Sequence, residues 1–318
     1  MGMHEALDLA ALRKSIDSVD AEIAALLRRR KELAAECQTH KTGALYCPER
    51  ETEILSSAQE PPVWAEILRA TRVDLLAIGR QPTGDKILPD GFSVIAGPCA
   101  IESEAQAFET ASALADLGIA RMRGGCWKPR TSPYAFQGHG ADALRWMRAA
   151  CDAHRLELWT EIRDIANLRH AQAVDVAWVG TRNAQNYELL QAIGKTCPRV
   201  VLKRGAGMTI EEWLNAAEYI RIGGASVALC ERGIRGFDTM LRNTLDIAGA
   251  VLAAAMGGYQ VIIDPSHSTG IPALIRPMVA AARAAGLSGA IVEAHPNPEA
   301  SITDAAQAIP LSALRDLL

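Results

Sequence analysis

Residues 200–205 read Val-Val-Leu-Lys-Arg-Gly, a short apolar run that ends in two cations and a glycine. Runs of this form recur along the chain and alternate with longer stretches of helical pattern. That alternation is typical of parallel strands separated by helices. Eight such units in one chain predict an α/β fold of the (β/α)8 TIM-barrel type rather than an open sheet. The eight runs are SVIAG (93–97), IARMRGG (119–125), LELWTE (156–161), VAWVG (176–180), VVLKRG (200–205), SVALCERG (226–233), QVIIDP (260–265) and GAIVEAH (289–295).

The segment before the barrel has a different period. Apolar residues from Leu12 to about Lys41 follow steps of four and three, which predicts an amphipathic helix with a bundle-like seam. Arg30 occupies the one seam position where an apolar residue would be expected. It is either a side chain that extends to solvent at a bundle edge or part of a buried anion site. The seam residues are Leu12, Ile16, Val19, Ile23, Leu26, Leu33 and Cys37.

Two further helices are expected in the N-terminal segment. One starts near Pro48, where a proline followed by acidic residues is a favourable helix start, and the other covers about 63–78. Residues 79–84 contain the glycines and proline of a connection. We therefore predict a small all-α domain over 1–80, a linker over 81–92 and the barrel over 93–318.

Composition excludes several classes of protein. The 318 residues include 33 Lys and Arg and 37 Asp and Glu, a formal net charge of −4. With a pI near 6.0 and no block of like charge, we expect no nucleic-acid partner. No apolar stretch is long enough to span a membrane, and the N-terminus lacks the apolar core of a signal peptide. Seven cysteines without a secretory signal favour reduced thiols and a cytoplasmic location.

Cations gather directly after the predicted strands, at the end where a TIM barrel places its active site. Arg supplies a bidentate fork and Lys a point charge, which are the groups that bind phosphate. So many cations in a chain that is acidic overall predict a site for more than one phosphate. The set comprises Arg123, Lys128, Arg130, Arg182, Lys203, Arg204 and Arg232.

A second group at the strand ends has the chemistry of metal ligands. Cys99, His267 and Glu293 offer a thiolate, an imidazole and a carboxylate, a plausible shell for a divalent metal. Taken alone, Cys99 would be interpreted as a small buried apolar residue. The other cysteines of the barrel keep that structural interpretation: Cys126, Cys151, Cys197 and Cys230.

From about residue 90 onward, the chain resembles the type I beta family of 3-deoxy-D-arabino-heptulosonate 7-phosphate (DAHP) synthases. The resemblance implies condensation of phosphoenolpyruvate with erythrose 4-phosphate, the first step of the shikimate pathway. The matching segments, in order, are Gly97-Pro98-Cys99, Arg123-Gly124-Gly125, Lys128-Pro129-Arg130-Thr131-Ser132-Pro133, Arg182-Asn183, Leu202-Lys203-Arg204-Gly205, Cys230-Glu231-Arg232-Gly233, Asp264-Pro265-Ser266-His267 and Glu293-Ala294-His295-Pro296.

The resemblance also implies roles for individual residues. The metal ligands would be Cys99, His267, Glu293 and Asp304. Phosphoenolpyruvate would bind to Arg123, Lys128, Arg182, Lys203 and Arg232. Erythrose 4-phosphate would bind to the loop Lys128, Pro129, Arg130, Thr131 and Ser132.

The same resemblance implies a mechanism and a cofactor. Lys128 would deliver a proton to the aldehyde oxygen, and His267 would be a metal ligand and a possible proton relay. Cys99 argues for a metal enzyme, because metal-free sister enzymes that use arabinose 5-phosphate have Asn at this position. The Pro129–Ser132 sequence favours the four-carbon aldose. We expect one divalent ion, with Mn²⁺ first and Co²⁺, Fe²⁺ or Zn²⁺ as alternatives.

Residues from about 8 to 78 resemble an all-helical chorismate mutase domain. The family's functional positions fall on Arg13, Arg30, Lys41, Arg50 and Glu51. Two positions depart from the family pattern: Cys47 stands where an Asp is usual, and Leu75 where a Gln or Glu is usual. The departures favour weak or absent mutase activity and a domain that senses chorismate or prephenate.

Three alternatives stay open at this stage. The enzyme could be bifunctional, with chorismate mutase turnover as well. The helical domain could be a cap that only holds subunits together. The barrel could be an inactive binding partner. The resemblance also implies a homo-oligomer, either a dimer or a tetramer.

Overall fold

The computed structural model describes residues 9–40, 47–75, 86–128 and 132–318. The chain divides into two compact units, Met1–Gln81 and Pro82–Leu318, and each is described by itself. Among the described residues, no helix is both long and apolar enough to cross a membrane.

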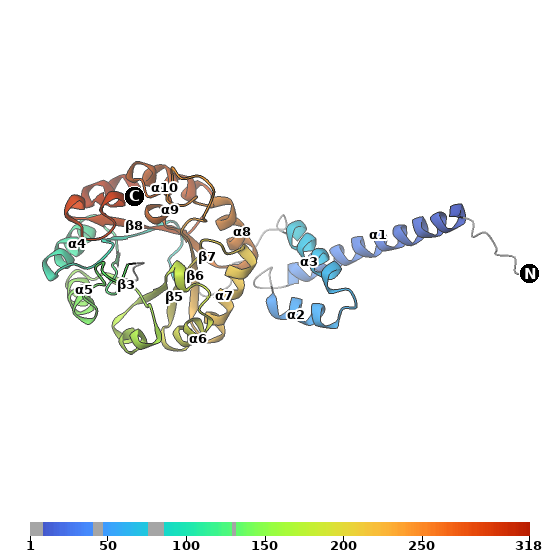
Figure 1. Ribbon diagram of the computed structural model, residues 1–318, viewed down its shortest axis with the longest axis horizontal. Helices are drawn as coiled ribbons and strands as arrows, with labels where there is room; N and C mark the ends of the chain where they lie inside the picture. The colour runs from blue at the N-terminus through green and yellow to red at the C-terminus, as the bar shows by residue number, and fades with distance from the viewer. Residues whose placement is uncertain (1–8, 41–46, 76–85, 129–131) are drawn as a thin grey trace, which may run out of the picture. The chain divides into compact units, whose positions relative to one another are not determined.

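The first unit contains the three expected helices: α1 (Leu9–His40), α2 (Pro48–Ser57) and α3 (Pro61–Leu75) (Figure 1). Proline stands in the first turn of α2, followed by the acidic residues Glu49 and Glu51, which complement the positive end of the helix dipole. The third helix starts at Pro61, two residues before the expected start at 63. Residues 76–78 of the predicted helix lie outside the described residues.

The predicted seam of α1 is not buried within its unit. Its apolar residues stay exposed, from 44% for Leu12 and Leu33 to 69% for Leu26. The local period was sufficient to predict the helix and its apolar face. It does not determine whether the same chain covers that face.

The second unit is a closed barrel of eight parallel strands, as predicted (Figure 1). Each strand pairs with the next in chain order, and β1 pairs with β8 along its full length to close the ring. A two-residue strand, β9 (Ile309–Pro310), adds to the end of β8. The barrel strands are β1 (Ser93–Gly97), β2 (Arg121–Arg123), β3 (Glu157–Glu161), β4 (Val176–Val179), β5 (Arg199–Lys203), β6 (Ser226–Glu231), β7 (Gln260–Ile263) and β8 (Gly289–His295).

Helices follow the strands and surround the barrel. Local sequence sets several of their starts: Thr209 and Glu212 form a capping box at α7, and the Asp246 carboxylate accepts from Gly249 N at α8. Between β3 and β4 the connection is a 3₁₀ helix, η2 (Ile165–Ala173). The α-helices are α4 (Glu104–Asp116), α5 (Ala141–His154), α6 (Tyr187–Thr196), α7 (Ile210–Ile222), α8 (Ile247–Gly257), α9 (Pro265–Thr269) and α10 (Ile275–Ala284), and the other 3₁₀ helices are η3 (Thr181–Asn183), η4 (Pro272–Leu274), η5 (Pro298–Ala300), η6 (Ala305–Gln307) and η7 (Leu311–Leu317).

The barrel interior is a packed core in which Ile95, Trp159 and Val201 are completely buried. Ile87 and Leu88, which we placed in the linker, belong to this core cluster. Gln260, at the start of β7, accepts hydrogen bonds from both of their backbone N–H groups at 2.8 Å. These contacts close the amino end of the barrel, so the opposite end is left for a site.

Candidate active site

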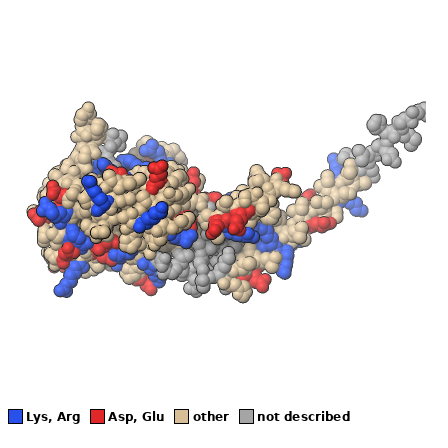
Figure 2. Space-filling view, turned by 90° about the horizontal axis from the view of Figure 1, so that it is seen from below, with Lys and Arg blue, Asp and Glu red and all other residues tan. Residues whose placement is uncertain are grey.

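A cavity of about 550 Å³ opens at the carboxyl ends of the strands. Its wall is dominated by cations, which come from separate strand ends and loops. On the surface seen in Figure 2, by contrast, Lys and Arg are interspersed with Asp and Glu. The site thus concentrates positive charge where small anions would enter. The cations that line it are Arg123, Lys128, Arg182, Lys203, Arg232, Arg235 and Arg242.

Arg123, at the end of β2, forms a buried ion pair with Glu293 of β8 at 2.9 Å. Its guanidinium and the ammonium of Lys203 lie 5.1 and 5.3 Å from the Trp178 ring centre, within range of cation–π attraction. Burial alone would lower the pKa of Arg123, but the charges of Glu293, Cys99 and Asp264 outweigh it and raise the pKa. Arg123 is therefore a fixed cation in the wall of the cavity.

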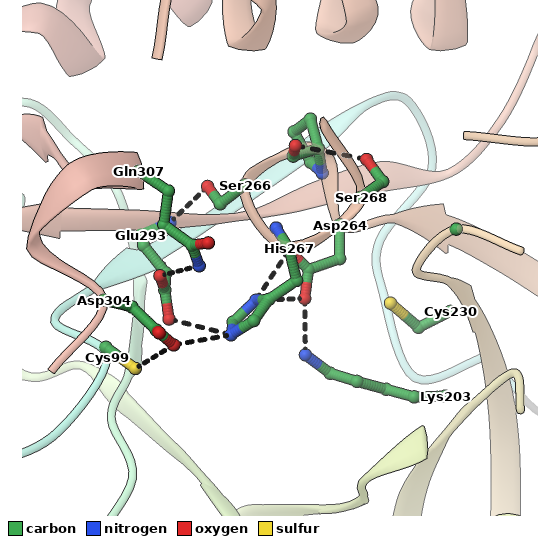
Figure 3. A network of polar contacts seen from close by, with 12 residues as sticks. Cys99, Lys203, Cys230, Asp264, Ser266, His267, Ser268, Glu293, Asp304 and Gln307 are labelled. Carbon is green, nitrogen blue, oxygen red and sulfur yellow. Dashed lines mark hydrogen bonds and ion pairs between the residues drawn. The ribbon is translucent and has the colours of Figure 1, made fainter. Parts of the chain in front are cut away.

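Lys203, Asp264 and His267 form a second buried network (Figure 3). Lys203 Nζ lies 2.6 Å from Asp264 Oδ2, and the same carboxylate oxygen lies 2.9 Å from His267 Nδ1. Burial acts to raise the pKa of Asp264, but His267 and Lys203 hold it well below its usual range. Asp264 also caps α9 by accepting from His267 N. The carboxylate therefore fixes both the orientation of the imidazole and the position of the ammonium.

Four donor side chains converge beside this network: Cys99, His267, Glu293 and Asp304 (Figure 3). One ligand atom from each lies within 4.8 Å of the others. Cys99 Sγ is 3.2 Å from Asp304 Oδ2, and His267 Nε2 is 3.0 Å from Glu293 Oε1. Sulfur, nitrogen and carboxylate oxygen in one cluster match the donor preferences of a divalent transition metal. The geometry therefore brings together the four residues predicted as metal ligands.

The protonation pattern of the cluster also fits a cation at its centre. Burial opposes ionisation of Glu293, yet His267, Arg123 and Lys128 hold its pKa well below the usual range. Burial acts to lower the pKa of His267, but the charges of Asp264 and Glu293 raise it to about 10. The pKa of Asp304 is lowered overall, despite burial and the nearby Glu293. Glu293 and Asp304 are thus ionised, and their carboxylates stabilise a positive charge placed between them.

Lys128 lies at the edge of the four-donor cluster. Its Nζ is 3.0 Å from both the carbonyl oxygen and the Sγ of Cys99. Burial acts to lower the pKa of Lys128, but Cys99 and Glu293 raise it. The ammonium is therefore retained as a proton donor next to the cluster.

The remaining predicted residues of the barrel divide into three groups. Arg182, Arg232 and Ser132 line the cavity with those already described. Pro129, Arg130 and Thr131 lie outside the described residues. Arg204 faces away from the cavity, and its guanidinium pairs with Glu231 and Asp246 at 3.0 and 2.9 Å.

The position of Arg204 has a simple cause. Lys203 is the last residue of β5, and successive side chains along a strand point to opposite faces. Only one residue of the Lys203-Arg204 pair can face the cavity. The alternation of side chains along a strand predicts that Lys203 and Arg204 face opposite sides, so placing both cations in the phosphate site was wrong for Arg204.

Sequence reasoning missed several polar residues at the site, among them Arg235, Arg242 and Gln307. Arg235 and Arg242 line the cavity from the connection after β6, and Gln307 lies in η6. Gln307 donates to Glu293 Oε2 and accepts from Arg242, each at 2.5 Å. All three residues lie several positions beyond a strand end, where the local pattern carries no signal of their location.

In the helical unit, the structure brings together only some of the predicted residues. The Arg30 guanidinium donates to Thr71 Oγ1 at 2.7 Å and lies 5.6 Å from the centre of the Trp64 ring. Glu51 pairs with Arg72 of α3. These contacts support an anchored Arg30 rather than a side chain that extends freely to solvent.

The other predicted residues of this unit are dispersed. Arg13 is exposed, seventeen positions from Arg30 on the same helix, a separation of about 25 Å. Arg50 pairs with Glu53 at 2.7 Å beside a cavity of about 360 Å³. Cys47 precedes α2 and makes no side-chain cap. Lys41 and the side chain of Leu75 lie outside the described residues.

Two family models match the chain. The model described as the DAHP synthetase I family matches residues 85–318. The model described as chorismate mutase type II matches residues 12–70.

Individual relatives agree with the match over the barrel. A phospho-2-dehydro-3-deoxyheptonate aldolase of Thermotoga maritima is 42% identical over 74% of this chain and 70% of its own length. A 2-dehydro-3-deoxyphosphooctonate aldolase of Acidithiobacillus ferrooxidans is 29% identical over 71% of this chain and 87% of its own. The crystal structure of the Thermotoga aldolase superposes with a TM-score of 0.70, covering 74% of this chain and 69% of that one.

Proposed function

Because the chain belongs to the DAHP synthetase I family, we propose that its barrel carries out a metal-dependent condensation of phosphoenolpyruvate with erythrose 4-phosphate. The products are DAHP and inorganic phosphate. One observation carries the proposal: four ligand atoms of mixed sulfur, nitrogen and oxygen chemistry lie within 4.8 Å of one another, beside a cavity lined by cations. Neither a purely structural barrel nor a simple anion-binding protein requires both features.

The cations supply a site for phosphoenolpyruvate. We assign its carboxylate and phosphate to Arg123, Lys128, Arg182, Lys203 and Arg232, which all line the cavity. Arg123 Nε is buried without a hydrogen-bond partner among the described residues. Such an unsatisfied donor is costly unless a ligand accepts from it. The loop from Lys128 to Ser132 is assigned to erythrose 4-phosphate.

Cys99, His267, Glu293 and Asp304 would hold the divalent metal. Mn²⁺ is our first choice, and the mixed donor set also suits Co²⁺, Fe²⁺ or Zn²⁺. When bound, the ion supplies Lewis-acid polarisation of the aldehyde carbonyl. Asp264 orients the imidazole by accepting from its Nδ1, which leaves Nε2 directed at the cluster.

The protein's own groups carry the remaining chemistry. The enol carbon of phosphoenolpyruvate attacks the aldehyde carbon, and the Lys128 ammonium gives a proton to the aldehyde oxygen. Positive charge develops on the carbon of phosphoenolpyruvate that bears the phosphate, and water adds there. Phosphate then leaves by cleavage of the bond between that carbon and the phosphate oxygen. Arg123, Arg182 and Arg232 hold the charge of the departing phosphate.

The test follows the loss of phosphoenolpyruvate absorbance in the full-length protein. We expect loss with erythrose 4-phosphate and Mn²⁺, little with arabinose 5-phosphate, and none after chelation. Cys99→Ala should abolish turnover, while the matched change Cys151→Ala, in a buried thiol of α5 away from the cluster, should retain it. Full activity of Cys99→Ala in excess metal would contradict the metal assignment.

For the helical unit we propose a regulatory site that binds chorismate or prephenate and inhibits the barrel. The anchored Arg30 supports carboxylate binding. Cys47 and Leu75, which depart from the family pattern, support weak or absent mutase turnover. Bifunctional catalysis is the alternative.

A pair of matched variants tests this regulatory site in the full chain. Arg30→Ala should abolish inhibition by prephenate without changing uninhibited turnover. Arg29→Ala removes a neighbouring exposed guanidinium that pairs with nearby Glu32, and it should retain inhibition. Direct measurement of chorismate disappearance tests the bifunctional alternative, which predicts turnover that Arg30→Ala removes.

We further propose that the chain is a homo-oligomer in which α1 packs against α1 of a second copy. The exposed apolar seam supports this, since an uncovered stripe of six large side chains is unfavourable in water. Arg13 and Arg30 lie too far apart on one helix to bind the same small dicarboxylate, but an antiparallel second helix could bring them together. Leu26→Glu should dissociate the oligomer and so lower the particle mass measured in solution. Ala21→Glu, outside the seam, should leave that mass unchanged.

We place the enzyme in the cytoplasm, which suits the presence of seven free thiols.

A further inference from the structure

Glu102 connects the two loops that carry Cys99 and Asp304. It follows β1, three residues after Cys99, and its side chain is only 11% exposed. Its Oε1 accepts from Ile302 N at 2.8 Å and from Ser301 Oγ at 3.1 Å. One carboxylate oxygen therefore binds the chain just before Asp304.

The other oxygen of Glu102 completes this anchor. Its Oε2 lies 3.5 Å from His295 Nε2, at the end of β8. His295 Nδ1 accepts from Asn297 N at 3.0 Å, and the side-chain amide of Gln106 lies 2.9 Å from His295 Nε2, so contacts on both sides of the ring hold it in place. His295 is the last residue of β8 and belongs to a sequence motif, yet it does not line the cavity. It belongs to the support of the 296–304 connection instead.

Asp304 needs such support because of its backbone. Its φ is +51°, in the left-handed region that non-glycine residues avoid. Strained positions of this kind persist where the surrounding contacts determine them, and they cluster at functional sites. The contacts here include Ser301 Oγ to Thr303 O at 2.8 Å, and Ser301 is itself held by Glu102.

We propose that Glu102 is a positioning residue that holds Asp304 in the geometry required for metal binding. The inference rests on the proposed metal function of the four-donor cluster. Outer groups that fix metal ligands change metal affinity by about 10–100-fold when they are removed. Glu102 touches none of the four ligand side chains in the described contacts. Its side chain accepts hydrogen bonds from Ser301 and Ile302, so we expect its effect on metal to pass through the 301–304 segment.

The test measures Mn²⁺ affinity of the full-length protein, with free Mn²⁺ detected by electron paramagnetic resonance. Glu102→Ala should weaken binding about tenfold. Glu102→Gln keeps an oxygen acceptor for Ser301 and Ile302 and should stay within about threefold of the unmodified protein. Glu104→Ala, an exposed neighbour in the first turn of α4, is the matched control.

A double-mutant cycle separates positioning from general support. Asp304→Gly removes the carboxylate and accepts the left-handed backbone. In that background, Glu102→Ala should change Mn²⁺ affinity by no more than about twofold, because the ligand it positions is absent. Ser301→Ala removes one of the two hydrogen bonds to Glu102 Oε1, together with the contact to Thr303 O, and leaves the bond from Ile302 N; it gives an intermediate effect if the segment acts as described.

Each contrary outcome has a distinct meaning. The inference is wrong if Glu102→Ala binds Mn²⁺ as tightly as the unmodified protein, or if it weakens binding equally in both backgrounds. If Asp304→Gly itself binds Mn²⁺ normally, the metal assignment of Asp304 fails, and the inference fails with it. Thermal unfolding of each variant identifies any loss caused by misfolding, and Glu102→Gln and Ser301→Ala then decide the result.

Discussion

The ammonium of Lys128 lies 3.0 Å from the sulfur of Cys99, within the buried end of the cavity. An ammonium beside the proposed metal cluster acts in two ways: its charge changes the affinity of the cluster for a cation, and it is placed to deliver a proton to an oxygen bound nearby. The two effects separate experimentally, because the first changes metal affinity and the second changes turnover.

Lys128→Met should reduce kcat/KM by about 10²–10⁴-fold, the usual contribution of a general acid. We expect a much smaller change in Mn²⁺ affinity, because all four ligands remain. Steady-state kinetics and Mn²⁺ titration of the same preparation check both parts. Lys195→Met, at an exposed position of α6, is the control. Equal losses in metal affinity and turnover would show that Lys128 acts through the metal site alone.

Arg204 gives the opposite expectation, since it is buried but faces away from the cavity. Arg204→Met leaves Glu231 and Asp246 without their cation. Removing one partner of a buried pair destabilises a protein by about 3–5 kcal/mol. We expect that loss in the unfolding free energy of the barrel, with kcat/KM per folded molecule nearly unchanged. Arg221→Met breaks a pair in which the arginine is exposed and Glu218 is half-buried, and it should cost far less. A large kinetic defect in Arg204→Met would show that Arg204 belongs to the substrate site.

The contrast between these two cations shows how far the sequence could predict the site. The eight strand runs are local patterns, so the barrel and the residues at strand ends could be predicted from them. The partners of those residues could not. Gln307 reaches Glu293 through a 3₁₀ turn, and Arg242 reaches the cavity through a long connection, so neither position follows from periodicity.

The helical unit shows a different limit. The seam of α1 was predicted correctly as an apolar face, but its exposure depends on which chain covers it. The contact between Arg30 and Thr71 also depends on the packing of α3 against α1, for which the sequence carries no local signal. The sequence therefore predicts the apolar face and the candidate binding residue Arg30, whereas the residues that contact them depend on tertiary packing.

The metal-free barrel should be most stable between about pH 5 and 6.5. Asp264 and Glu293 have pKa values held well below their usual range. Their stabilisation is present above the unfolded values of about 3.9 and 4.3, and it is lost as pH falls through the lower folded values. His267 has its pKa raised to about 10, so its stabilisation is complete below about 6.5 and is lost as pH rises toward 10.

Denaturant unfolding of the chelated protein at pH 3–10 measures this profile. The decline above pH 6.5 should disappear in His267→Gln, because that variant lacks the titrating group. A metal-free protein whose stability rises from pH 7 to 10 would contradict the assignment of a protonated His267.

Trp178 should contribute to substrate affinity although it has no charge of its own. Its ring lies beneath Arg123 and Lys203, 5.1 and 5.3 Å from their cationic groups, and its residue is almost completely buried. Each desolvated cation–π contact contributes up to about 2 kcal/mol, and the ring also fixes where the two cations point. Trp178→Phe keeps an aromatic face and should raise the KM for phosphoenolpyruvate only about two- to fivefold. Trp178→Leu loses that face, and we expect a rise of ten- to about a hundredfold, with a smaller change in the KM for erythrose 4-phosphate. If Leu and Phe behave alike, the ring acts only by filling volume, and the placement of Arg123 and Lys203 must come from Glu293 and Asp264 alone.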